Sequence, residues 1–263
     1  MVNVADLTIT SLDTIKAYSI AGKPRFILDE LQEATIANTE EKVDITGKGG
    51  RKLNSLKRNK ACTISGANGL LSAGMLEAQT GSKFEHNDSA TVAWTDYLYA
   101  SANTVVLDYP AVGTAGAEIE TVYVANNVGI ASKVYEQGDA VAEGVFTYDP
   151  DTRTITFPEG AVEDGQQVVV FYTRTVEADV LVNQSDVYSE KLRLYVDGIA
   201  EDKCANQYHV QFYFPMADFN GNFDIALGGD QTVHNFEAES LSGSCGGAGQ
   251  LWTYTVFGVT NAA

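Results

Sequence analysis

The chain has 263 residues, enough to bury one large or two smaller β-rich cores without a metal ion or a disulfide. Its net charge of −18 and pI near 4.4 give a surface that repels nucleic acid and anionic membranes. The three cysteines are widely spaced and match neither a disulfide framework nor a zinc site. The sequence contains no secretory signal pattern and no apolar run of about 18 residues, so it predicts no membrane contact and synthesis in a reducing cytoplasm.

Charge is distributed unevenly along the chain. Seven of the 17 basic residues lie between Lys42 and Lys60, whereas 26 acidic and six basic residues follow from Glu85 onward. One basic projection on an acidic body would suit head-to-tail contact between identical subunits. A solvated surface loop would produce the same pattern, because most charge runs in proteins are solvated faces.

The first part of the chain predicts strands followed by a long loop. Residues 17–19 and 25–39 have strand character and are separated by a turn. Residues 47–60 are basic and punctuated by glycine, which predicts an irregular loop before a strand at 61–65. Loops of this length usually carry function.

A helix is predicted over residues 69–80, with Asn68 as its N-cap and Gly81 just past its end. A single amphipathic helix among strands normally covers one end or face of a sandwich or barrel. The apolar stripe expected to pack on the sheet consists of Leu70, Leu71, Met75 and Ala78.

The remainder of the chain predicts further strands, and its amino-acid composition changes partway along. Residues 101–176 are rich in Gly, Ala and Val with frequent turn signals, which favours a small β domain inserted in a larger one. Residues 1–100 and 177–263 then form the main β domain. Near the end, residues 207–214 alternate between apolar and polar side chains, as a half-buried strand does.

The sequence predicts no catalytic residue, no cofactor and no metal site, and therefore no enzyme. The glycines around Lys48 lack the spacing of a phosphate-binding loop. Cys245 and His234 could be proposed as nucleophile and base, but no flanking signature or third residue supports them. The sequence offers few metal ligands of the nitrogen type, because its only histidines are His86, His209 and His234.

Four stretches of the chain resemble the major tail protein of bacteriophages, the subunit of the tail tube. The first runs from DITGKGGRKL to GSKFE at residues 44–85, and the second, KLRLYVDGIAEDKCANQYHVQFYFPMADFNGNFDI, covers 191–225. QTVHNFEAESL at 231–241 and LWTYTVFG at 251–258 complete the resemblance, which lies outside the predicted insertion.

The resemblance implies a tail-tube-like β-sandwich or barrel with one flanking α-helix, in hexameric rings that stack into a hollow tube in the virion. DNA would pass through the lumen without specific binding, and Glu237 and Glu239 are candidates to face it. The inserted β domain would lie on the outer surface. Tape-measure, terminator and tail-tip proteins are the further partners implied, with assembly in the host cytoplasm. The long loop would contact the neighbouring ring through Lys48, Arg51, Lys52, Leu53, Lys57 and Arg58.

Two other classes of function remain open on the sequence alone. One is a different β-rich virion protein, such as a capsid decoration or a receptor-binding module, which would form monomers or closed oligomers. The other is a carbohydrate-binding protein or enzyme, which would need a cleft with aromatic platforms and, for hydrolysis, a pair of carboxylates at a defined separation.

Overall fold

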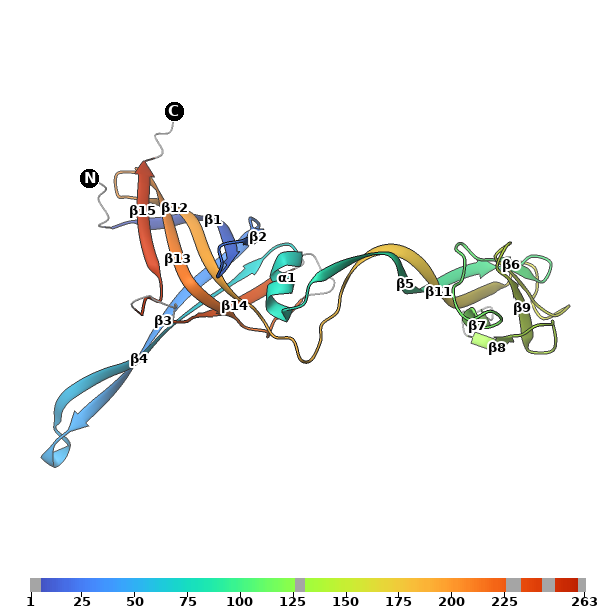
Figure 1. Cartoon of the computed structure of the whole chain (residues 1–263), viewed down its shortest axis with the longest axis horizontal. Coiled ribbons are helices and arrows are strands. Elements are labelled where there is room, and N and C mark those ends of the chain that lie inside the picture. The colour runs from blue at the N-terminus through green and yellow to red at the C-terminus, as the bar shows by residue number, and fades with distance from the viewer. Residues whose placement is uncertain (1–5, 126–130, 226–232, 243–248, 260–263) are drawn as a thin grey trace. The chain divides into compact units, whose positions relative to one another are not determined.

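The computed structural model describes residues 6–125, 131–225, 233–242 and 249–259. The chain forms two compact units, one from Met1–Phe84 and Leu181–Ala263 and the other from Glu85–Val180 (Figure 1). Each unit contains its own β-sheet and its own hydrophobic core. The mainly β fold with one short α-helix predicted from the sequence is confirmed.

The first unit is built on an eight-stranded sheet that curls into a half-barrel. Its order is β2-β1-β12-β13-β14-β4-β3, and β15 also pairs with β13. The sheet branches because residues 208–213 of β13 pair with β15, whereas Ala217–Phe219 pair with β14. The strands are β1 (Thr8–Ser19), β2 (Pro24–Leu28), β3 (Leu31–Thr46), β4 (Lys52–Asn68), β12 (Lys191–Glu201), β13 (Gln207–Phe219), β14 (His234–Ser240) and β15 (Thr253–Val259).

Strict alternation of side chains decides which face of the sheet is buried. Along β14, the buried residues His234, Phe236 and Ala238 alternate with exposed polar residues. The buried face belongs to a core inside the curl that includes Ile15, Leu194 and Phe214. The opposite face of β14 is therefore free to meet solvent or another molecule.

The helix α1 (Ala73–Thr80) is shorter than the sequence predicted, and the predicted start is wrong. Asn68 ends strand β4, and the N-cap is Ser72, whose Oγ accepts a hydrogen bond from the Met75 N–H at 3.3 Å. Leu70 and Leu71 precede the helix and are 59% and 52% exposed, so they do not pack on the sheet. Met75 and Ala78 are fully buried in the core.

Substitution of Gly81 is expected to destabilise the first unit strongly. Gly81 ends α1 with φ = 73°, and a Cβ there would lie 2.0 Å from the Tyr188 carbonyl oxygen. Gly22 has a similar φ of +86° but nothing within 4 Å of an added Cβ, so it is a matched control. We expect Gly22→Ala to cost about 1–2 kcal/mol and Gly81→Ala about 3 kcal/mol or more. Urea unfolding followed by Trp252 fluorescence in a Trp94→Phe background measures both, and equal losses would contradict the clash.

A buried histidine joins the helix to strand β14. The Ser72 N–H donates to His234 Nδ1 at 3.4 Å, so the other ring nitrogen carries the proton and donates to Gln79 Oε1 at 2.7 Å. Gln79 Nε2 in turn donates to the Asn235 carbonyl at 2.8 Å. Burial lowers the pKa of His234 below its ordinary value, because the charged ring would lose its hydration. The neutral ring thus holds α1 against the sheet.

This arrangement predicts a specific pH dependence of stability. At His234, the unfolded chain binds more protons than the folded chain as the pH falls through the ordinary histidine pKa of about 6.5. The free energy of unfolding contributed by His234 should therefore be full well above that pH and fall as the pH drops through it towards the lowered pKa of the folded state. His234→Gln should lack this component, and the difference between wild type and variant in urea unfolding should shrink with acidification. Parallel curves for the two proteins would show that the ring is not held neutral.

The second unit contains a seven-stranded sheet of order β5-β11-β7-β8-β9-β10-β6. A buried carboxylate, Asp96, accepts hydrogen bonds from Trp94 Nε1, the Asp108 N–H and the Tyr172 hydroxyl, each at 2.9 Å. Arg174 stacks its guanidinium over the Trp94 ring nearby, at 4.2 Å from the centroid. The strands are β5 (Phe84–Tyr99), β6 (Thr104–Val106), β7 (Ile119–Ala125), β8 (Ala131–Gln137), β9 (Val145–Asp149), β10 (Thr154–Thr156) and β11 (Gln167–Leu181).

Candidate assembly surfaces

The distal part of the β3–β4 hairpin projects from the rest of the first unit as a two-stranded ribbon (Figure 1). We call residues 40–60 the arm. None of its residues is buried, whereas Cys62 and Ile64 at the base of β4 lie in the core. A ribbon of two strands is marginally stable in water on its own, so an exposed one of this length is typical of a segment that contacts a partner.

The tip of the arm is a tight glycine turn, and the predicted irregular loop over 47–60 is wrong. Strand β3 continues to Thr46 and β4 begins at Lys52, so only five residues connect them. Gly49 and Gly50 take φ values of 77° and 75°, which other residues adopt at a cost. The Gly47 N–H donates to the Arg51 carbonyl at 2.8 Å and closes the turn. The sequence suggested a loop because neither face of the ribbon is covered, and so neither face is consistently apolar.

Much of the basic charge on the arm is paired across the two strands. Lys52 contacts Asp44 at 2.6 Å, Lys57 contacts Glu40 at 2.8 Å, and Arg58 contacts Glu41 at 2.7 Å. These bases lower the pKa of each carboxyl through hydrogen bonds to its charged form. Exposed ion pairs of this kind contribute little stability. They do, however, decide which basic side chains of the arm remain unpaired and can contact another molecule.

The tip retains uncompensated positive charge. Lys48 and Arg51 are exposed, and none of the ion pairs among the described residues includes either of them. Apolar side chains accompany them: Leu53 is 60% exposed, Leu56 52% and Ile45 41%. A basic tip with apolar flanks fits an acidic partner surface that also offers apolar contact.

The outward face of β14 is acidic and adjoins a polar hollow. Glu237 and Glu239 are exposed on this face, and in the described part of the chain neither pairs with a lysine or arginine. On the β4 side, Glu237 lies opposite Ser65 and Glu239 opposite Thr63, and on the β13 side Glu239 lies opposite Asp218. Glu237, together with Glu33 and Asp224, lines a concavity of about 600 Å³. The arrangement places a negative wall on the side of the sheet away from the core.

Comparison with protein families decides the identity of the chain. The sequence pattern of the YomU/Tube protein family matches residues 7–251, a range that includes both structural units. The chain belongs to the YomU/Tube protein family. This is a phage tail tube family, so the resemblance to tail tube subunits is confirmed. The comparison with curated proteins gives no match.

Membership of the Tube family assigns the chain a structural role in the phage tail, and such proteins are not enzymes. The family also implies self-assembly. Among the helices of the described residues, none combines the length and apolar character needed to cross a membrane.

The Tube-family structure distributes the predicted contact residues over two parts of the arm. Lys48 and Arg51 lie in the tip, whereas Lys52, Leu53, Lys57 and Arg58 lie on strand β4. Sequence reasoning missed Ile45 and Leu56, whose apolar side chains are exposed on the same ribbon. In the sequence, each of these two residues is a single apolar residue between polar neighbours. That pattern usually marks a core position on a strand, but here the strand is not covered and the side chain is exposed.

Proposed function

We propose that this Tube-family chain forms hexameric rings that stack into the hollow tube of a phage tail, a conduit for DNA delivery into the host. The observation that carries the proposal is the arm, whose exposed surface is not covered by any other described residue of its own subunit. From residue 39 to the tip at residue 47, a strand rises roughly 25 Å. That reach suffices for contact with a subunit in the next ring.

Head-to-tail contact through the arm would produce an open filament. The arm and the surface that receives it are different patches of the same subunit, so the contact is heterologous and repeats without limit. Lys48 and Arg51 would contact carboxylates of the next ring, which are abundant because the rest of the chain is strongly acidic. This attraction between opposite charges would orient one ring on the next. Leu53 would contribute apolar burial at the same contact.

Glu237 and Glu239 are proposed to face the lumen. They stand on the sheet face away from the core, without basic partners in the described regions. An acidic wall would hold DNA phosphates off the surface, so that the tube guides DNA without retaining it.

The second unit is proposed to project from the outside of the tube, since it has its own core and is inserted between strands of the first. Tape-measure, terminator and tail-tip proteins are the expected partners at the ends of the tube. Assembly would take place in the host cytoplasm before the tail joins the virion.

Electron microscopy of the purified, tag-free chain tests the proposal directly. Negative-stain images should show rings with six-fold symmetry and tubes built from them at high protein concentration. Monomers alone, or closed oligomers that never extend, would contradict it and favour a capsid decoration or receptor-binding role instead.

Reversal of the acidic wall should make the tube retain DNA. Replacing Glu237 and Glu239 with Lys should give tubes that hold short double-stranded DNA at about 0.1 M salt and release it as salt rises. The matched control replaces Glu143 and Glu159, two exposed carboxylates of the second unit, with Lys. Co-sedimentation of labelled DNA with tubes provides the measurement. Equal retention by both variants would show that the β14 face does not line the lumen.

A further inference from the structure

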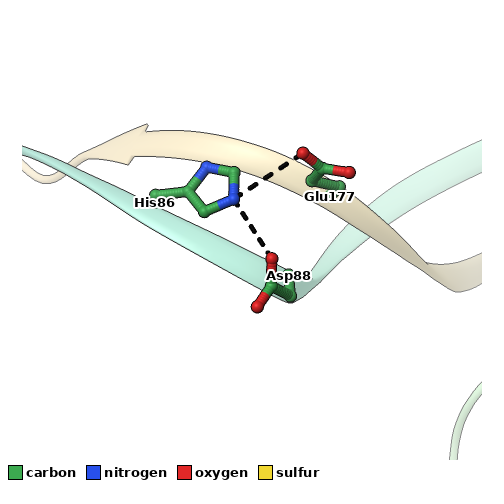
Figure 2. Close-up of side chains that lie close together, drawn as sticks. All are labelled: His86, Asp88 and Glu177. Atoms are coloured by element: carbon green, nitrogen blue, oxygen red, sulfur yellow. Dashed lines mark hydrogen bonds and ion pairs between the residues drawn. The ribbon is translucent and has the colours of Figure 1, made fainter.

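We propose that His86, Asp88 and Glu177 form a site for a divalent transition metal such as Zn²⁺ on strands β5 and β11 of the second unit. Figure 2 shows the three side chains converging from the two neighbouring strands. Their candidate ligand atoms all lie within 4.8 Å of one another. The site is independent of the tube proposal, because it depends only on contacts within the second unit.

The strand geometry places the ligands on one face without any special loop. His86 and Asp88 are two residues apart on β5, and side chains at that spacing point to the same side of a strand. Glu177 and Asp179 repeat the spacing on β11, where they alternate with the half-buried Val176 and Ala178. The two strands are hydrogen-bonded neighbours, so the backbone fixes the distance between the ligand pairs.

The distances suit a tetrahedral metal. His86 Nε2 lies 3.1 Å from Asp88 Oδ1 and 3.6 Å from Glu177 Oε1. Ligand atoms bound to zinc at about 2.1 Å stand about 3.4 Å apart on a tetrahedron, a value between these two. One imidazole and two carboxylates leave the fourth position open to water or another ligand.

Asp179 orients the imidazole from the other side. Its Oδ1 lies 2.9 Å from His86 Nδ1, so the Nδ1–H donates to this carboxylate. On the other side of the ring an Nε2–H donates to Asp88 Oδ1 at 3.1 Å, and a bound metal ion would take the place of that proton. A carboxylate behind a metal-binding histidine fixes the ring and raises its basicity. Asp179 is therefore a positioning residue, not a ligand.

The local charge also favours a divalent cation. Three carboxylates surround His86, and in the described regions no ion pair joins any of them to a lysine or arginine. A proton on the imidazole would neutralise one of these negative charges, whereas a metal ion would neutralise two and bind Nε2 as well. Mixed nitrogen and oxygen ligands favour zinc over calcium, which prefers oxygen alone.

Calorimetric titration of the tag-free, metal-stripped full chain with Zn²⁺ tests the site. We expect one saturable site per chain that depends on His86, so His86→Gln should weaken zinc binding at least about tenfold. Asp179→Ala should weaken it about tenfold, because the ring loses its orienting acceptor. His209→Gln is the matched control and should bind as wild type does, since His209 stacks on Phe257 in the first unit.

Hydrogen exchange provides a second readout that locates the bound ion. Zinc should slow exchange at the amides near His86 and Glu177 in wild type, because it crosslinks the two strands, and not in His86→Gln. The proposal is overturned if no saturable zinc binding occurs, or if His86→Gln binds zinc as tightly as wild type. Calcium binding as tight as zinc binding would likewise overturn it, because it would indicate a site made of carboxylates alone.

Discussion

Removal of the arm is expected to abolish tubes while leaving the subunit folded. Thr39 and Ala61 face each other on β3 and β4, so an Asn-Gly turn replacing residues 40–60 would close a regular two-residue hairpin there. The deleted residues contribute nothing to the core. We expect an unchanged urea unfolding curve and no tubes in negative-stain images. Tubes of normal length from this variant would show that the arm has no role in stacking.

Charge reversals on the arm sharpen this test by separating free charges from paired ones. Lys48→Glu with Arg51→Glu removes the uncompensated charge at the tip, and we expect tubes to become shorter and more sensitive to salt. Lys57→Glu with Arg58→Glu makes the same charge change, but these residues already contact Glu40 and Glu41 within the arm. The tip pair should therefore have the larger effect on mean tube length. The reverse order would place the contact on the strands of the arm.

The parts of the fold that sequence reasoning predicted are those where burial imposes a pattern. Strand β13 and strand β14 each have one face in the core, so their apolar residues alternate and can be recognised. The arm has no buried face, so its strands carry no such pattern and suggested a loop. The glycines at the tip were recognised, but their turn occupies only residues 47–51.

The helix boundary and the proposed metal site show a second limit of prediction from a single sequence. Leu70 and Leu71 have helical spacing with Met75, but Ser72 provides the cap and leaves them outside the helix. His86 and Asp88 could be noticed as a pair, but Glu177 and Asp179 follow about 90 residues later in the chain. Only the pairing of β5 with β11 brings the two pairs together, and a single sequence does not reveal such long-range pairing.

Loss of the buried carboxylate is expected to unfold the second unit selectively. Asp96→Ala removes the acceptor of three hydrogen bonds, one of them from the buried Tyr172 hydroxyl, and leaves the Asp108 N–H and the Trp94 indole N–H without this partner. We expect a loss of about 3–5 kcal/mol in the stability of this unit. Tyr172→Phe removes one donor and should cost about 1–2 kcal/mol. Burial and the Asp96 carboxylate raise the pKa of Tyr172, so its hydroxyl stays protonated and donates at all ordinary pH values.

The two tryptophans allow each unit to be followed separately, because Trp94 lies in the second unit and Trp252 in the first. In a Trp252→Phe background, Asp96→Ala should shift the urea midpoint reported by Trp94 far below that of the parent. In a Trp94→Phe background, Asp96→Ala should leave the urea midpoint reported by Trp252 unchanged, because the two cores are separate. If the first unit alone builds the tube, these variants should still assemble. Loss of tubes together with an intact Trp252 transition would instead assign the second unit a part in the walls.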